Sequence, residues 1–297
     1  MKRIHLIRFA NHALLVVVLL LLLIWPAWVV LAATSYSSAH HARLAGSESI
    51  YLPIAVKNEP SATPSPTPSP IASPTPFTCE IAGVRYEKIP IKGIPDTERD
   101  DAEHADLNLA VRGYEEVDEF KGLVKYDGAI DSQAPQLAGL FADDRTPAFS
   151  STYRVYDWDW ANNERGDLIS NWDVTLAGLL TTAGETIHVP DREGPDIFQG
   201  RFKVLVIYAN ENFITLKYTR NDNVVFGYTI HVENVCVEPS LLELYREGNE
   251  AGRTELPALA AGQAFGRANG AEIRVAIRDT GSFMDPRSRK DWWRGNR

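Results

Sequence analysis

The chain has 297 residues, of which 44% are hydrophobic and 23% are charged, and its formal net charge is −9. This balance excludes a wholly disordered chain, and the negative charge argues against a nucleic-acid partner. Two cysteines are too few for a four-cysteine zinc site or for a small disulfide-framework protein.

Residues 1–33 have the pattern of an export signal. Lys2, Arg3 and Arg8 precede a long apolar run that ends in small residues. The run is about 20 residues long, so an uncleaved anchor spanning the membrane once is the alternative. Without its three basic residues the net charge falls from −9 to −12. The sequence predicts an exported protein, extracellular or at the cell surface, either secreted or membrane-anchored.

A spacer is expected after the signal. Residues 34–58 are an exposed linker with a short strand-like patch at 49–56. Residues 59–76 (EPSATPSPTPSPIASPTP) contain seven prolines in eighteen positions. Such a run stays extended at about 3 Å per residue, which gives a stalk roughly 50 Å long.

Residues 77–297 are expected to form one mainly β domain. β-branched and aromatic runs predict a hairpin of two strands, a longer strand bent at Gly227, and a fourth alternating strand. One segment has helical spacing, and a long stretch without a period is expected to be an irregular insertion. The two hairpin strands are 202–209 and 212–219, the longer strand is 223–237, and the fourth strand is 272–279. The helical segment is 239–252, and the stretch without a period is 115–200.

Cys79 and Cys236 fit one disulfide, because exported proteins meet oxidising conditions. The bond would tie the start of the domain to a central strand and close a loop of about 157 residues. The chain-entropy model gives such a loop an upper value of roughly 5 kcal/mol. Two buried free thiols are the alternative.

The last third of the chain resembles the lysostaphin-type (LytM-like) zinc endopeptidases, which cut peptidoglycan cross-bridges. The segments that carry this likeness are EHADLNLAVRGY (103–114), NFITLKYTRNDNVVFGYTIHVENV (212–235), LPALAAGQAFGRANG (256–270) and GAEIRVAIRDTGSFMDPR (270–287). The resemblance implies the sheet of that family and a groove for peptidoglycan.

The resemblance also implies that the metal site has been lost. His104 matches the family's first zinc ligand and His231 its catalytic histidine, but Asn108 stands in place of the carboxylate ligand and Arg274 in place of the last histidine ligand. A catalytic zinc needs three protein ligands, and arginine offers no lone pair to a metal. These positions are therefore vestigial, with no cofactor expected. His231 is either an inherited groove residue or a partly exposed strand histidine.

The densest aromatic segment is 152–167, in which Tyr156, Trp158 and Trp160 would share one face of a strand. Three rings on one face can stack on sugar rings, so they are candidate ligand-binding residues; packing against the core is the alternative. The basic tail carries Trp292 and Trp293, which either dock on an anionic partner or pack back onto the domain.

These observations favour a non-catalytic cell-envelope binding or scaffolding protein, whose partner is a cell-wall polymer or another envelope protein. Membrane contact is expected only through residues 1–33, if they are uncleaved. The alternatives are an active zinc endopeptidase acting on peptidoglycan, the one case that needs zinc, and an aromatic-rich surface adhesin.

Overall fold

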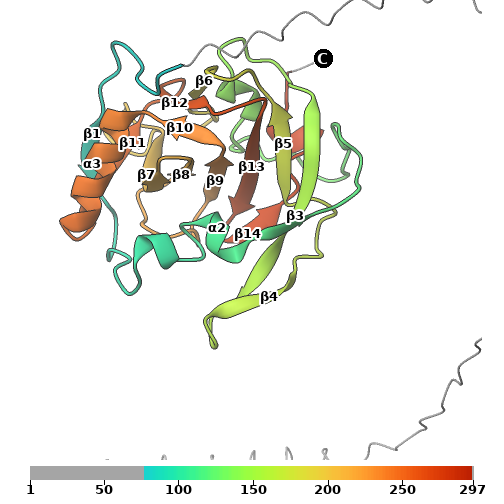
Figure 1. Ribbon diagram of the computed structural model, residues 1–297, viewed down its shortest axis with the longest axis horizontal. Helices are drawn as coiled ribbons and strands as arrows, with labels where there is room; N and C mark the ends of the chain where they lie inside the picture. The colour runs from blue at the N-terminus through green and yellow to red at the C-terminus, as the bar shows by residue number, and fades with distance from the viewer. Residues whose placement is uncertain (1–76, 296–297) are drawn as a thin grey trace, which may run out of the picture. The chain divides into compact units, whose positions relative to one another are not determined.

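The computed structural model describes residues 77–295. The expected signal (1–33), linker (34–58) and stalk (59–76) lie outside the described residues. Within them, the strands form an eleven-stranded sheet and a three-stranded sheet, and every pairing between named strands is antiparallel (Figure 1). The prediction of a mainly β domain is confirmed.

The large sheet has the order β1-β11-β7-β8-β9-β13-β5-β3-β2, with β14 paired to β13 and β4 paired to β3. The small sheet has the order β10-β12-β6. The strands are β1 (Glu87–Pro90), β2 (Tyr114–Glu116), β3 (Phe149–Asp159), β4 (Glu164–Leu168), β5 (Leu176–Leu180), β6 (Thr186–His188), β7 (Val204–Asn210), β8 (Phe213–Lys217), β9 (Tyr228–Glu233), β10 (Val235–Val237), β11 (Glu255–Leu259), β12 (Ala264–Ala268), β13 (Glu272–Asp279) and β14 (Ser282–Met284).

Short helices complete the domain. They are η1 (Asp101–Glu103), α2 (Leu109–Arg112), η2 (Leu137–Leu140), α3 (Pro239–Glu250) and α4 (Arg289–Trp292). The predicted helix is confirmed as α3, which lies beside β1 and β11 (Figure 1). Its first turn is capped by the carboxylate of Glu238, which accepts from the backbone N–H groups of Ser240 and Leu241.

The core is built by alternation along β8, β9 and β13. One face of these strands carries Ile214, Leu216, Ile230, Val232, Val275 and Ile277, and all six are fully buried. The predicted hairpin is confirmed as β7 and β8, and the predicted strand at 272–279 is β13. Because side chains alternate between the two faces of a strand, the opposite face of the same strands is polar.

The predicted long strand at 223–237 is wrong in two respects, its start and its continuity. The strand breaks at Asn234 rather than bending at Gly227, because Asn234 adopts a left-handed backbone conformation (φ 59°) between β9 and β10. Asparagine tolerates that conformation better than most residues. The break sends β10 into the small sheet, and residues 223–227 form a loop.

The expected irregular insertion at 115–200 is also wrong. It contains β3, β4, β5 and β6, and β3 and β5 are interior strands of the large sheet. β3 has no clear hydrophobic period because it buries Ser151 and Thr152 together with Phe149, Tyr153 and Val155. The β3–β4 hairpin extends from the body of the domain (Figure 1).

The disulfide between Cys79 and Cys236 is confirmed. It ties the start of the domain to β10, in the small sheet, rather than to a central strand. A disulfide is typical of an oxidising, non-cytoplasmic environment. Among the helices of residues 77–295, none combines the length and the apolar character needed to cross a bilayer.

The tail packs back onto the domain. Trp292 and Trp293 are buried, and their indole N–H groups donate to the carbonyls of Asp285 and Pro286. Arg294 donates to three backbone carbonyls of residues 131–134, and Arg287 is buried against the carboxylate of Asp285. Arg287, Trp292 and Trp293 are therefore part of the core, while Arg289 is exposed.

Candidate functional site

The polar face of β8, β9 and β13 carries two of the predicted site residues, His231 and Arg274. The strand pairing places its side chains in three rows that run across the sheet. The rows are Phe213, Glu233 and Arg274; Thr215, His231 and Ala276; and Lys217, Thr229 and Arg278. Most of this face is buried, because residues 104–112 lie across it and Thr215 donates a 2.7 Å hydrogen bond to the carbonyl of Leu107, while the side chain of Arg274 at one end is 26% exposed.

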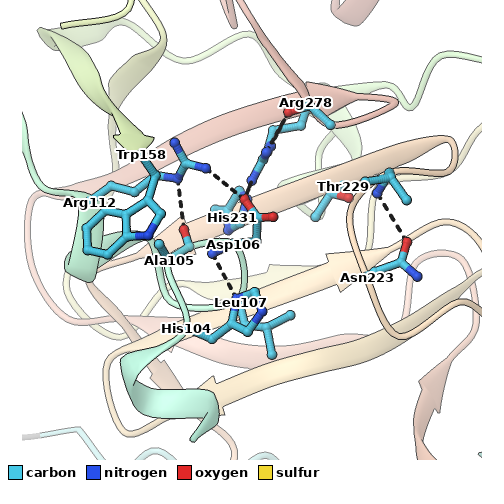
Figure 2. Close-up of polar contacts among 12 residues, drawn as sticks. His104, Ala105, Asp106, Leu107, Arg112, Trp158, Asn223, Thr229, His231 and Arg278 are labelled. Atoms are coloured by element: carbon cyan, nitrogen blue, oxygen red, sulfur yellow. Dashed lines mark hydrogen bonds and ion pairs between the residues drawn. The ribbon is translucent and has the colours of Figure 1, made fainter. Parts of the chain in front are cut away.

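A cluster of two arginines and one carboxylate joins that covering segment to the sheet. Arg112 and Arg278 both donate to Oδ1 of Asp106, at 2.8 and 2.6 Å, and approach it from two sides (Figure 2). Burial raises the pKa of Asp106, but the two guanidinium groups outweigh burial and hold that pKa below its usual range. Asp106 is therefore a carboxylate at neutral pH, and both arginines are buried.

His231 lies beside this cluster and is completely buried, so its interpretation as a partly exposed strand histidine is wrong. Its Nδ1 is 3.1 Å from Thr215 Oγ1. The single hydroxyl proton of Thr215 goes to Leu107, so the network assigns the His231 proton to Nδ1 and the lone pair to Nε2. Burial, and then the charge of Arg278, hold the pKa of His231 well below its usual value.

Nε2 of His231 is buried without a hydrogen-bond partner among the described residues. The ring lies between Phe213 and Phe283, at centroid distances of 6.0 and 6.3 Å. A neutral imidazole with a free acceptor is chemically able to accept a proton. It is sealed from solvent, however, and no acidic group is paired with it.

Lys217 adds a third buried basic side chain to the same face. Its ammonium group donates to the carbonyls of Phe226 and Gly227 and to Thr229 Oγ1. Burial lowers the pKa of Lys217 to about 7, and the charge of Arg278 acts in the same direction. This side chain fixes the 219–227 loop to the sheet.

His104 and Asn108 have structural partners. Nδ1 of His104 accepts from the backbone N–H of Asp106 at 3.1 Å, and Nε2 is 3.1 Å from Asp96 Oδ2. Both nitrogens of the ring are thus in use. Asn108 caps α2 by accepting from the N–H of Ala110, and its amide donates to the carbonyl of Ala102. His104 is also buried.

Arg274 belongs to a second polar network at the other end of the same face. It donates to Glu272 at 2.9 Å and to the hydroxyl of Tyr114 at 2.7 Å, and Tyr114 donates to Glu233 at 2.8 Å. Ser150 and Ser151 donate to Glu272. A Cβ at Gly178 would lie 2.1 Å from the hydroxyl of Ser151, so only glycine fits opposite this network.

These positions do not fit the zinc ion that the family resemblance implies. His104 has no free lone pair, Asn108 is a helix cap, and Arg274 is an ion-paired guanidinium. Within residues 77–295, no group of three or more His, Cys, Asp and Glu side chains has the arrangement to hold a metal ion.

A cavity of about 490 Å³ opens where the arginine cluster reaches the surface. Its lining includes Arg112 and Arg278, the indole ring of Trp158, the β13–β14 turn at Gly281, and the carboxylates of Asp157, Asp159 and Asp167. Polar groups from the 166–171 segment surround it. The cavity thus combines an aromatic ring with charged and polar groups. A second cavity, of about 630 Å³, lies near Gln136 and Arg294 and contains none of the predicted site residues.

The three predicted aromatic residues separate into two environments. Trp158 and Trp160 meet edge to face at 6.4 Å, and Trp160 is 42% exposed and contacts the ring of His104. The indole N–H of Trp158 is buried without a partner among the described residues. Tyr156 does not line the cavity: Arg165 stacks on its ring, and its hydroxyl donates to Glu115.

The sequence interpretation missed Arg112, Lys217 and Arg278 as members of one site. Lys217 and Arg278 occupy polar positions of alternating strands, which the pattern alone treats as facing solvent. A signal was present, because Lys217 lies two residues from Thr215 and Arg278 two residues from Ala276. Thr215 and Ala276 are in the same row as His231. Only the covering by residues 104–112, more than 100 positions earlier in the chain, shows that the face is buried.

No protein-family model matches the chain, and no curated protein or solved structure matches it at a significant level.

Proposed function

We propose that this chain is an exported, non-catalytic cell-envelope binding protein, and that the cavity beside Trp158 binds a saccharide of the cell wall. The observation that carries the proposal is the cavity itself, whose lining combines the indole ring of Trp158 with hydrogen-bonding side chains. Binding sites for small ligands combine apolar walls with a few polar groups that fix the orientation of the ligand.

The lack of catalysis is supported by the contacts of the residues that stand at the family's catalytic and metal-binding positions. His231 is sealed beneath residues 104–112, and the counterparts of the metal ligands are engaged as a helix cap and in ion pairs. In this proposal the domain descends from a peptidase of the lysostaphin type. The buried arginine–aspartate cluster then stabilises the fold where a reaction centre once was.

The preference for a sugar is supported by the groups around the cavity. The flat ring of Trp158 offers an apolar surface for the CH face of a pyranose. Ser170, Asn171 and Ser282 also line the cavity and offer donors and acceptors for hydroxyl groups. Export is supported by the basic and apolar pattern of residues 1–33 and by the disulfide.

Co-sedimentation of the full-length protein with purified peptidoglycan tests this function. The wild-type chain is expected to pellet with the wall, and Trp158→Ala to lower the apparent affinity about tenfold, or roughly 1.4 kcal/mol. The matched control is Phe120→Ala, because Phe120 is a 68% exposed aromatic residue outside the cavity, and binding by this variant should equal wild type.

Equal loss in both variants, or no pelleting of the wild-type chain, would overturn the proposal. If the chain bound another envelope protein but did not bind peptidoglycan, the scaffolding alternative would be supported. Stoichiometric zinc in the purified protein, together with cleavage of peptidoglycan cross-bridges, would establish the peptidase alternative.

A further inference from the structure

The groups that line the cavity carry more negative than positive charge. Arg112 and Arg278 line it, but both are ion-paired with Asp106. The lining also contains three carboxylates, those of Asp157, Asp159 and Asp167. Opposite charges attract across an interface, whereas like charges repel. The cavity therefore favours a ligand that brings hydrogen-bond donors and has no negative charge of its own.

Two of these carboxylates are already engaged. Oδ1 of Asp157 lies 3.3 Å from the guanidinium group of Arg112 and also accepts from the backbone N–H of Trp158 at 2.8 Å. Both oxygens of Asp159 accept hydrogen bonds within its own turn, one from the backbone N–H and the other from the side-chain amide of Asn162. The third carboxylate is therefore the one whose lone pairs are all available to a ligand.

That third carboxylate belongs to Asp167. The residue lies on β4 and is exposed, and within residues 77–295 its side chain makes no hydrogen bond and no ion pair. A carboxylate has two oxygens that accept hydrogen bonds and no proton to donate, and the bonds that it accepts are stronger than those between neutral groups. Asp167 can thus accept from two neighbouring donors of one sugar ring while that ring stacks on Trp158, which lines the same cavity.

The two sugars of peptidoglycan differ in the donors that they offer to such a carboxylate. N-acetylglucosamine has an amide N–H and a hydroxyl group on neighbouring ring carbons. N-acetylmuramic acid carries a lactyl ether on the oxygen of that hydroxyl group, which removes one donor and adds a carboxyl group. The first sugar matches an acceptor in the cavity lining, whereas the second lacks a donor and, where its carboxyl group is free, is repelled.

We propose that Asp167 determines the specificity of the cavity and selects N-acetylglucosamine, by accepting hydrogen bonds from its amide N–H and its neighbouring hydroxyl group. This inference rests on the proposed saccharide binding and names the sugar that is bound. The same carboxylate, together with those of Asp157 and Asp159, disfavours acidic sugars.

NMR titration of the full-length protein with three monosaccharides measures this selectivity. The probes are N-acetylglucosamine, the methyl ester of N-acetylmuramic acid, and N-acetylmuramic acid itself. The ester lacks the donor but is uncharged, so the series separates the donor from the charge. The wild-type protein should bind N-acetylglucosamine about tenfold more tightly than the ester, because one hydrogen bond to a charged group is lost. It should bind the ester about threefold more tightly than the acid, and this second ratio should fall as salt is raised.

Variants assign the selectivity to one side chain. Asp167→Asn removes the charge and keeps the size, so both affinity ratios should fall toward one. Because the side chain of Asp167 has no partner to lose within the described residues, this change should leave the stability of the domain close to wild type. The matched control is Asp143→Asn, at a surface ion pair with Arg145 outside the cavity, and it should keep both wild-type ratios.

Equal or tighter binding of either muramic probe by the wild-type protein would overturn this inference and leave saccharide binding intact. Ratios that stay at their wild-type values in Asp167→Asn would do the same. So would failure of all three probes to bind a protein that still pellets with peptidoglycan through Trp158. Failure of all three probes together with no pelleting would overturn both the inference and the proposed function.

Discussion

The guanidinium group of Arg278 donates a 2.6 Å hydrogen bond to the carboxylate of Asp106, which lies 172 positions earlier in the chain. The bond joins a loop near the start of the domain to a central strand near its end. Arg112 holds the same oxygen atom from the loop side at 2.8 Å. The carboxylate of Asp106 therefore holds residues 104–112 against the polar face. The same carboxylate positions the two arginines that line the cavity.

Asp106→Asn should destabilise the domain by about 3 kcal/mol, because removing one partner of a buried ion pair leaves uncompensated charge behind. Here two buried arginines would lose their common acceptor. Urea denaturation at pH 7 measures the change. Asp143→Asn is the control, since Asp143 pairs with Arg145 at the surface and should cost less than about 1 kcal/mol. Similar small losses in both variants would contradict the central role of Asp106.

Lys217 should make the domain more stable as pH rises from about 7 toward 10. The pKa of Lys217 in the folded chain is about 7, against an ordinary value of 10.5. Between these values the unfolded chain binds a proton that the folded chain does not, so the free energy of unfolding increases with pH. The slope from this group is at most about 1.4 kcal/mol per pH unit.

Denaturation midpoints between pH 6.5 and 9.5 check this slope. Lys217→Met should flatten it, whereas Lys121→Met, at an exposed lysine, should preserve it. A wild-type slope that survives in Lys217→Met would show that other groups cause it.

Thr280→Asn should stabilise the domain by roughly 0.5–1 kcal/mol. Thr280 and Gly281 connect β13 to β14, and both have positive φ angles, of 48° and 86°. A two-residue turn of this kind favours asparagine followed by glycine, and β-branched residues are strained there. Thermal unfolding measures the gain, and a lower midpoint than wild type would show that the threonine is not strained.

Replacing Cys79 and Cys236 together by serine should lower the free energy of unfolding by roughly 2–5 kcal/mol, because the bond closes a loop of 157 residues. The measurement is denaturation of the double variant beside the oxidised and the reduced wild type. The reduced protein should behave like the variant. An unchanged midpoint on reduction would mean that the crosslink adds nothing to stability.

The parts of the fold that sequence could predict are those with strong local patterns. β7, β8 and β13 have clear alternation or dense β-branched runs, and α3 has helical spacing. The cysteine pair followed from the count of two cysteines together with the expectation of export. β3 escaped prediction because it carries buried Ser151 and Thr152, whose hydroxyls donate to Glu272 of β13 and to the carbonyl of Val117, just after β2.

The site could be predicted only in part, because its burial and its ion pairs also depend on residues that are distant in the sequence. His231 was singled out in the sequence, but its complete burial could not be predicted, because the covering segment comes from more than 100 residues away. Arg112 and Arg278 look like surface residues until Asp106 is placed between them. Pairing of buried charges over such distances has no local pattern in the sequence.

The central claim is that the cavity beside Trp158 binds a wall saccharide, and the indole N–H resonance of Trp158 tests it most directly. Full-length protein labelled with ¹⁵N at tryptophan would be titrated with soluble glycan fragments of peptidoglycan, and Trp158→Phe would assign the signal. The resonance of Trp158 should shift in a saturable way, while those of Trp292 and Trp293, buried and hydrogen-bonded to backbone carbonyls, should stay fixed. A wall-binding protein whose Trp158 resonance does not move would contradict the account.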